Sequence, residues 1–384
     1  MMKRRQLILR IISVFFVIGT AFAFWYHRHE FVIHNTSIQQ YENVQWAVDY
    51  PHYTPDETVL QNQPPGPTGY VPSPAATKAF LKLLPKATLR EAGPELYLSR
   101  GDDDPILLYR ALQKAYREHG GQGTWTVGRQ GIGDCVSWGW AHGADIHLAT
   151  MYCEGDSGEW RPAATEPIYG GSRVEAVGKS SGGWQDGSYG AAAAKWVKDW
   201  GILFREPYDG VDLSTYSAER AKQWGNYGCG GKNDSGNLDG VAKKHPVKNV
   251  ALVGTYADAV AAITSGYPVA VCSNQGFGST RDSEGFLAAR GTWFHCMVFI
   301  GVRHDTPGLL CLNSWGPNWV DGPKWPSDQL DGSFWVNERT VDKMLGQGDS
   351  FAVSGYQGFP ARKLNHENWV KVDTQVPTVF AQGL

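Results

Sequence analysis

The stretch of sequence that decides the fold is Gln130-Gly131-Ile132-Gly133-Asp134-Cys135-Val136-Ser137-Trp138-Gly139-Trp140-Ala141. A glycine turn precedes Cys135, and the residues after it place Trp138, Ala141 and Leu148 along one face of an expected helix. A cysteine at a helix start lies beside exposed backbone N–H groups, and the helix dipole favours its thiolate. The stretch therefore predicts either a nucleophilic thiol with a lowered pKa or a buried cysteine that acts as a small apolar residue.

A thiol nucleophile needs a base, and geometry excludes the nearest histidine. His142 lies on the same helix as Cys135, a rise of roughly 10 Å away. His295 instead opens an apolar strand, and Asn313 directly follows the next strand, 309–312. Two adjacent strands would hold the imidazole and the amide side by side, with Trp315 excluding water from their hydrogen bond.

The order of elements along the chain indicates an α+β fold. Helices are expected at 75–84, 104–121, from 135 onward, 189–200 and 256–265. Strands are expected at 269–272, 296–302, 309–313 and 333–337. Because the helices come first and the strands later, the two kinds of element should form separate halves of one domain.

These segments, in this order, resemble the papain-like cysteine peptidase family, the papain/cathepsin fold. The family carries Gln-Gly followed by Gly-Ser-Cys-Trp-Ala-Phe, then His-Ala-Val at a strand start, then Asn-Ser-Trp-Gly. The corresponding stretches here are 130–138, 295–298 and 313–316, and the similarity spans residues 125–358. The resemblance implies a two-lobed α+β fold, with a helical left lobe, a central nucleophile helix and a β-barrel-like right lobe.

The resemblance also implies a role for each candidate residue of the catalytic site. Cys135 would be the nucleophile, His295 its base, and Asn313 the residue that orients the histidine. Gln130 would supply the side-chain amide of the oxyanion hole, alongside the backbone N–H of Cys135. Such a site needs no metal and no organic cofactor.

Substrate binding is implied by the same resemblance. Gly182 and Gly183 look like the glycine pair whose backbone binds an extended substrate, and Trp315 would line the site. The implied partner is a peptide or protein substrate. The composition, with 19% charged residues and a net charge of −3, indicates neither a disordered chain nor a nucleic-acid-binding surface.

The nucleophile stretch departs from the family pattern in its spacing. The interval from Gln130 to Cys135 is one residue shorter, so Ser137-Trp138 competes as the match to the family's Cys-Trp. Cys135 is preferred, because a thiol forms its anion more easily than a hydroxyl does. Asp134 replaces a small residue, and a carboxylate there would oppose the thiolate.

Two rival functions therefore stay open beside a cysteine-type endopeptidase that works through a thiol acyl-enzyme. The first is a binding or structural module that keeps the fold without turnover. The second is a thiol acyltransferase or amidase that acts on cell-wall peptides.

The cysteines and the N-terminus predict an extracytoplasmic protein. Lys3, Arg4 and Arg5 precede an apolar run, 7–26, which is typical either of a cleaved signal peptide or of an uncleaved membrane anchor. Cys272, Cys296 and Cys311 are expected to be buried thiols, and Cys153 and Cys229 are candidates for a disulfide; those five and Cys135 are the chain's cysteines.

The expected organisation has four parts. Residues 1–26 form the signal peptide or anchor, through which the chain would associate with a membrane. Residues 27–124 form an extension with a Pro-rich linker or wrapping arm and short helices. The peptidase-like domain is 125–360, and 361–384 form a tail. The sequence does not set the oligomeric state.

Overall fold

The computed structural model describes residues 64–98, 104–178, 186–234, 236–245 and 247–364. The expected leader, 1–26, and the pair Gly182 and Gly183 lie outside these ranges. Among the described residues, no helix has the length and apolar character needed to cross a membrane.

The elements of the described chain are short, apart from one central helix and one long strand. The helices are α2 (Pro74–Leu81), α3 (Leu89–Ala92), η2 (Pro94–Tyr97), α4 (Tyr109–Glu118), α5 (Cys135–Cys153), α6 (Thr165–Arg173), α7 (Gly190–Asp199), α8 (Ala218–Tyr227), α9 (Asn237–Ala242), α10 (Tyr256–Thr264) and α11 (Glu338–Leu345). The strands are β1 (Ile106–Leu107), β2 (Pro207–Tyr208), β3 (Val211–Asp212), β4 (Asn249–Leu252), β5 (Val269–Phe277), β6 (Ala289–Arg303), β7 (Gly308–Leu312), β8 (Ser333–Asn337) and β9 (Phe351–Ser354).

One antiparallel sheet organises the C-terminal half. Its strands run in the order β4-β9-β5-β6-β7-β8, and β1 pairs with β6. Nothing in the described chain pairs β4 with β8, so the sheet is open. The expected α+β class is confirmed, but the β-barrel-like description of the right lobe is wrong, because the two end strands do not meet.

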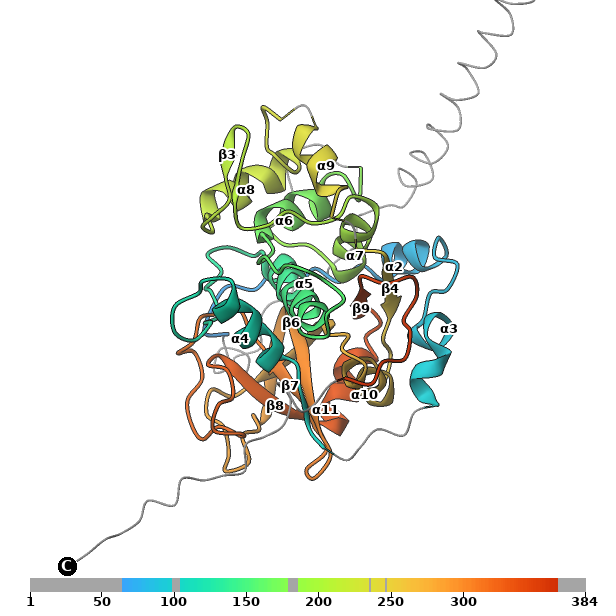
Figure 1. Cartoon of the computed structure of the whole chain (residues 1–384), viewed down its shortest axis with the longest axis vertical. Helices are drawn as coiled ribbons and strands as arrows, with labels where there is room; N and C mark the ends of the chain where they lie inside the picture. The colour runs from blue at the N-terminus through green and yellow to red at the C-terminus, as the bar shows by residue number, and fades with distance from the viewer. Residues whose placement is uncertain (1–63, 99–103, 179–185, 235, 246, 365–384) are drawn as a thin grey trace, which may run out of the picture. The chain divides into compact units, whose positions relative to one another are not determined.

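Helix α5 lies between the sheet and the helices α6 to α9 (Figure 1). It is buried on all its faces except near its C-terminal end, as expected for a helix that packs on both sides. It approaches β6 closely at Gly139, where an added Cβ would lie 2.8 Å from the carbonyl oxygen of Met297. A glycine at this position therefore permits the contact that brings the start of α5 to β6.

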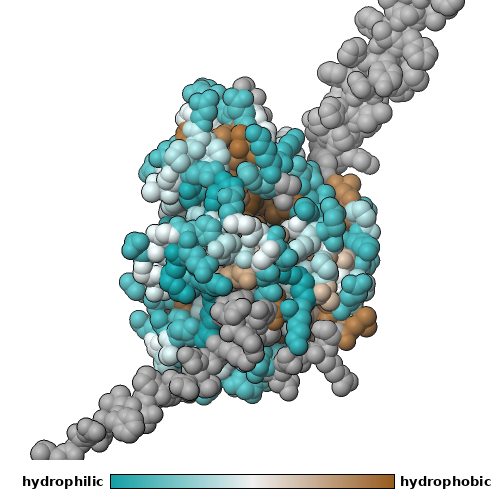
Figure 2. Space-filling view, in the orientation of Figure 1, coloured by the Kyte–Doolittle hydropathy of each residue, from teal (hydrophilic) through white to brown (hydrophobic). Residues whose placement is uncertain are grey.

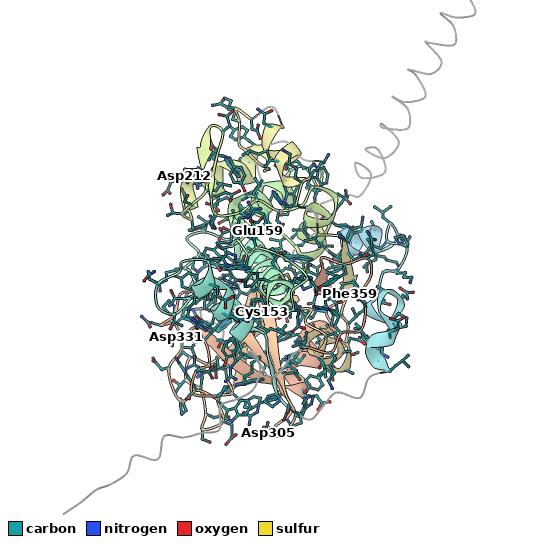
Figure 3. The ribbon with its side chains drawn as sticks, viewed as in Figure 1. Cys153, Glu159, Asp212, Asp305, Asp331 and Phe359 are labelled. Carbon is teal, nitrogen blue, oxygen red and sulfur yellow. A yellow bond between two sulfur atoms is a disulfide. The ribbon has the colours of Figure 1, made fainter. Side chains whose placement is uncertain are left out.

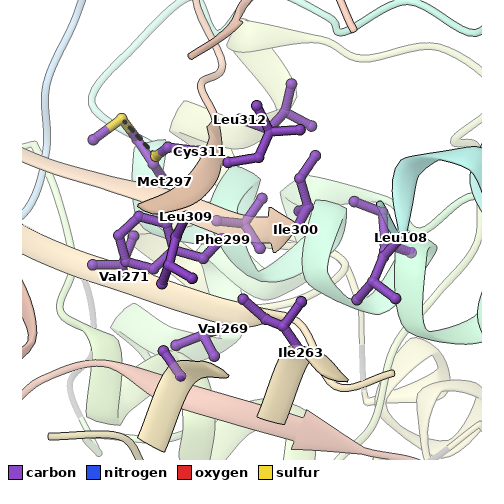
Figure 4. Packing of buried hydrophobic residues seen from close by; sticks show 14 of the residues in the cluster. Leu108, Ile263, Val269, Val271, Met297, Phe299, Ile300, Leu309, Cys311 and Leu312 are labelled. Carbon is purple, nitrogen blue, oxygen red and sulfur yellow. Dashed lines mark hydrogen bonds between the residues drawn. The ribbon is translucent and has the colours of Figure 1, made fainter. Parts of the chain in front are cut away.

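The hydrophobic core lies on the sheet and under α5. Met297, Phe299 and Ile300 of β6 pack with residues of β5 and β7, as Figure 4 shows. Leu108 joins the same cluster from the N-terminal part of the chain. The described part of the expected extension thus packs on the same core, while the boundaries assigned to 27–124 and 125–360 stay predictions.

One face of the molecule can be followed in the space-filling view. The face shown in Figure 2 is mostly hydrophilic, with hydrophobic residues in small separate areas. Charged side chains such as Asp212, Asp305 and Asp331 lie at the periphery of the ribbon (Figure 3).

The cysteines pair differently from the expectation. Cys272 and Cys296 form a disulfide between β5 and β6, because the two residues lie opposite each other in the strand register. Cys153 and Cys229, the expected candidates for a disulfide, are both free thiols. The sequence alone does not give a register, which explains the wrong pairing.

Asp349 joins the N-terminal part of the chain to the helical lobe. Its buried carboxylate accepts hydrogen bonds from the hydroxyl of Thr77 on α2 at 3.0 Å and from the backbone N–H groups of Gly190 and Ala191 at 2.7 and 2.8 Å. The last two donors begin α7, where a helix has N–H groups without intrahelical partners.

We predict that Asp349→Ala lowers the free energy of unfolding by about 3 kcal/mol, because it leaves three donors without their acceptor. Urea denaturation measures the change. Asp209→Ala is the control, since Asp209 is exposed on the surface. Equal stability of the two variants would contradict the role of Asp349.

Candidate active site

Cys135 is the first residue of α5, as the sequence predicts. Its side chain is 0% exposed. The backbone N–H groups of Val136, Cys296 and Gly69 lie near its sulfur and favour the thiolate. The thiol therefore lies beside β6, immediately next to the position of His295.

His295 and Asn313 are hydrogen-bonded across the two strands that carry them. The distance from His295 Nε2 to Asn313 Oδ1 is 2.7 Å, and both side chains are buried. Because an amide oxygen only accepts, Nε2 carries the proton and Nδ1 is the basic nitrogen. Nδ1 is buried and has no hydrogen-bond partner among the described residues.

Trp315 covers the histidine as expected. Its ring stacks on the His295 ring with centroids 4.5 Å apart. Trp293 and Trp319 meet the same indole edge to face, at 4.9 and 5.3 Å. The indole is thereby held in place, and it keeps water from the bond between His295 and Asn313.

Gln130 lies on the loop before α5, and its side chain is fixed by two contacts. Nε2 donates to the carbonyl of Ile132 at 2.9 Å, and Oε1 accepts from the hydroxyl of Ser314. A primary amide has two N–H donors, so one remains for a ligand. This arrangement holds Gln130 against the segment that begins with Asn313.

Ser137, the rival for the nucleophile, is engaged elsewhere. Its hydroxyl donates to the backbone carbonyl of Asp134 at 2.7 Å, within the first turn of α5. A hydroxyl committed to its own helix is poorly placed to give its proton to His295. The geometry therefore favours Cys135 over Ser137.

Asp134 is buried beside the nucleophile. Oδ2 accepts from the Tyr216 hydroxyl at 2.9 Å, and Oδ1 is buried without a hydrogen-bond partner in the described part of the chain. Burial raises the pKa of Asp134 to about 8, and the hydrogen bond from Tyr216 opposes this change. At neutral pH the side chain is thus mainly a neutral carboxylic acid, which opposes the Cys135 thiolate less than a carboxylate would.

Residues 64–71 run across this site as an extended chain, which we name the covering segment. Gly69 and Val71 exchange backbone hydrogen bonds with Ser188, both at 2.8 Å. The Trp315 indole N–H donates to the carbonyl of Pro67, also at 2.8 Å, and Tyr70 N–H donates to the carbonyl of Phe294 at 3.1 Å. The covering segment therefore lies over Cys135, with the backbone N–H of Gly69 near its sulfur.

Burial favours the neutral forms of Cys135 and His295. Burial raises the pKa of Cys135 to about 12, with a smaller contribution from Asp134. Burial also lowers the pKa of His295 to about 4, against the opposing effect of Asn313. The expected lowered pKa of Cys135 is therefore wrong for this conformation: a neutral thiol and a neutral imidazole lie under the segment.

Within the described residues, the backbone that pairs with the covering segment is that of Ser188. Gly182 and Gly183 lie outside the described residues, so their role stays a prediction. Ser188 lies two residues before α7 and makes both of these backbone hydrogen bonds. The glycine at 187 was the sequence signal that could have pointed to this place. Its φ is 125°, a backbone conformation that favours glycine.

Comparison with known proteins gives structural similarity alone. No family model matches the chain, and no curated protein matches it. Among solved structures, it is similar to xylellain, a cysteine protease from Xylella fastidiosa, with 16% identity, 79% of this chain and 95% of that chain covered, and a TM-score of 0.43.

Two further solved structures are similar to the chain. Digestive procathepsin L 3 of Tenebrio molitor larval midgut has 14% identity, 72% and 79% coverage and a TM-score of 0.41. Procathepsin B S9 from Trypanosoma congolense has 12% identity, 75% and 86% coverage and a TM-score of 0.44. The chain thus resembles papain-like cysteine proteases.

Proposed function

We propose that this protein is a cysteine endopeptidase that hydrolyses peptide bonds through a thioester on Cys135. The observation that carries the proposal is the buried pair of His295 and Asn313, which leaves Nδ1 of the imidazole without a hydrogen-bond partner among the described residues. Cys135, at the start of α5, lies near the backbone of Cys296, the residue after His295. A histidine held in one tautomer by a neutral amide suits a thiol nucleophile.

The proposed reaction uses only side chains of this site and water. His295 Nδ1 takes the proton of the Cys135 thiol, and the sulfur attacks the peptide carbonyl carbon. The backbone N–H of Cys135 and the remaining amide hydrogen of Gln130 stabilise the oxyanion. His295 then protonates the leaving amine, and a water molecule, deprotonated by the same imidazole, hydrolyses the thioester.

The covering segment favours one alternative, a binding module without turnover. Cys135 is fully buried, and a thiol with a pKa of about 12 is a poor nucleophile. The two functions differ in the reactivity of Cys135 once the segment has left the site. A peptidase gains a reactive thiol, whereas an inactive module does not.

The location outside the cytoplasm belongs to the same proposal. The basic and apolar residues at 3–26 support export. The disulfide between Cys272 and Cys296 supports an oxidising compartment, because such bonds are rare in reducing ones.

We predict that Gly69→Val uncovers the nucleophile in the full chain. A Cβ at Gly69 would overlap the carbonyl of Gly133, so the covering segment has to leave. The alkylation rate of Cys135 at neutral pH, measured by mass spectrometry with a thiol-directed epoxide, should rise at least about tenfold, because each unit of thiol pKa is a factor of ten in thiolate.

Gly158→Val is the matched control, since an added Cβ there meets no atom within 4 Å. Cleavage of a pooled peptide library is the second readout. Labelling with cleavage supports the peptidase, and labelling alone indicates another acyl chemistry. No labelling of Gly69→Val would refute the proposal in favour of an inactive module.

A second prediction separates the two candidate nucleophiles. In the Gly69→Val chain, Cys135→Ala should lower peptide hydrolysis by about three orders of magnitude. Ser137→Ala should change kcat little, because it removes only a hydrogen bond to the backbone of Asp134. If Ser137→Ala abolished hydrolysis and Cys135→Ala did not, Ser137 and not Cys135 would be the nucleophile.

A third prediction concerns Asp134, whose neutral form opposes the Cys135 thiolate less than a carboxylate would. Its pKa is about 8 in the folded chain against an ordinary value of 3.8, so the unfolded chain releases this proton first. The stability that this group contributes is full below pH 4 and is lost as the pH rises to 8.

Asp134→Asn removes that loss, so its stability relative to the unsubstituted chain should rise between pH 5 and 8, by up to about 1.4 kcal/mol per pH unit. Urea denaturation across this interval tests it. A difference between the two proteins that does not change with pH would show that Asp134 is already ionised in the folded chain.

A further inference from the structure

The covering segment shows what kind of chain the site accommodates. It makes backbone hydrogen bonds to the protein, and of its larger side chains Tyr70 is buried. Pro65 and Pro67 are exposed, so the site imposes little on them. Gly66 and Gly69, by contrast, lie against the protein at the two places where the segment passes closest to the catalytic residues.

The first close contact is with Trp315. A Cβ added at Gly66 would lie 2.6 Å from Cδ1 and 2.7 Å from Cγ of the indole. The ring has no free direction in which to retreat, because it stacks on His295 and meets Trp293 and Trp319 edge to face. Only a residue without a side chain fits on this face.

The second close contact is with the loop that carries the nucleophile. A Cβ added at Gly69 would overlap the backbone of Gly133. This loop is also fixed, because Gly133 N–H donates to Asp186 Oδ2 at 2.6 Å and the Tyr169 hydroxyl donates to the other oxygen of the same carboxylate. Backbone packs on backbone here, and no side chain fits between.

We propose that the site selects extended peptides with glycine at two positions three residues apart, one on the Trp315 ring and one against Gly133. The substrate class is therefore a glycine-rich peptide with a Gly-x-x-Gly spacing. The proposal rests on the peptidase function for its cleavage readout, but its binding readout does not depend on turnover.

The restriction applies to a peptide that runs in the direction of the covering segment. That segment runs parallel to the backbone at Ser188, as the pairing of Tyr70 with Ser188 shows. The two walls consist of an indole ring and main-chain atoms, and they exclude the Cβ positions of a backbone in this direction.

The test uses the full-length Gly69→Val chain, whose own segment is displaced, and a labelled peptide with the sequence of residues 64–72. Fluorescence polarisation measures its Kd. Alanine in place of either glycine should weaken binding at least about tenfold, the usual scale of overpacking a rigid site. Alanine in place of Pro65 is the matched control and should change Kd little.

A second substitution in the protein should restore the binding of one of the altered peptides. Trp315→Ala in the Gly69→Val chain should restore affinity for the peptide with alanine at the place of Gly66, but not for the one changed at Gly69. General loss of structure would not produce this pattern. Gly66→Val is a second displaced chain for use if Gly69→Val does not fold, as judged by circular dichroism.

The outcomes separate selectivity from activity. Equal Kd values for the glycine and alanine peptides overturn the inference, and so does a parent peptide that does not bind the displaced chain. Cleavage of library peptides without glycine enrichment overturns it and leaves the peptidase standing. Tight, glycine-dependent binding with no cleavage supports it and overturns the peptidase.

Discussion

The close approach of α5 to β6 at Gly139 is the contact on which the site depends. A side chain there would collide with the backbone of Met297, and the helix would move away from the strand. Because Cys135 begins the helix and His295 lies on the strand, this contact brings together the two elements that carry the proposed nucleophile and base. The disulfide at Cys296 and the bond between His295 and Asn313 then fix the strand side of the same junction.

Much of this arrangement could be predicted from the sequence, for physical reasons that differ between elements. The helix after Cys135 and the strands β7 and β8 have strong apolar patterns bounded by turn residues, so their positions agree with expectation. Strand β6 begins earlier than expected, at Ala289, so His295 lies within the strand and does not open it. The strands β4 and β9 are four residues each, too short for a pattern to identify them. The pairing of Cys272 with Cys296 required the register, which is a long-range property.

The same limit explains what the sequence did not show about the site. Helix position alone predicts a thiolate at Cys135, because a local argument includes the dipole but not what covers the sulfur. Burial of the sulfur in the folded chain outweighs the nearby backbone N–H groups and raises the pKa of Cys135. Asp134 shows the same effect, since burial converts an expected charge into a neutral acid that the site tolerates.

Tethering gives the covering segment an advantage over any free peptide. It is joined to α2, which is anchored through Thr77 and Asp349, so it competes as an intramolecular ligand. Short flexible links give effective concentrations on the order of millimolar. A free peptide of equal intrinsic affinity would need a similar concentration to occupy half of the sites. A peptide far below this concentration would not displace the covering segment. A substrate held close to the site, on a shared surface or in a shared assembly, would have a similar effective concentration and would displace it.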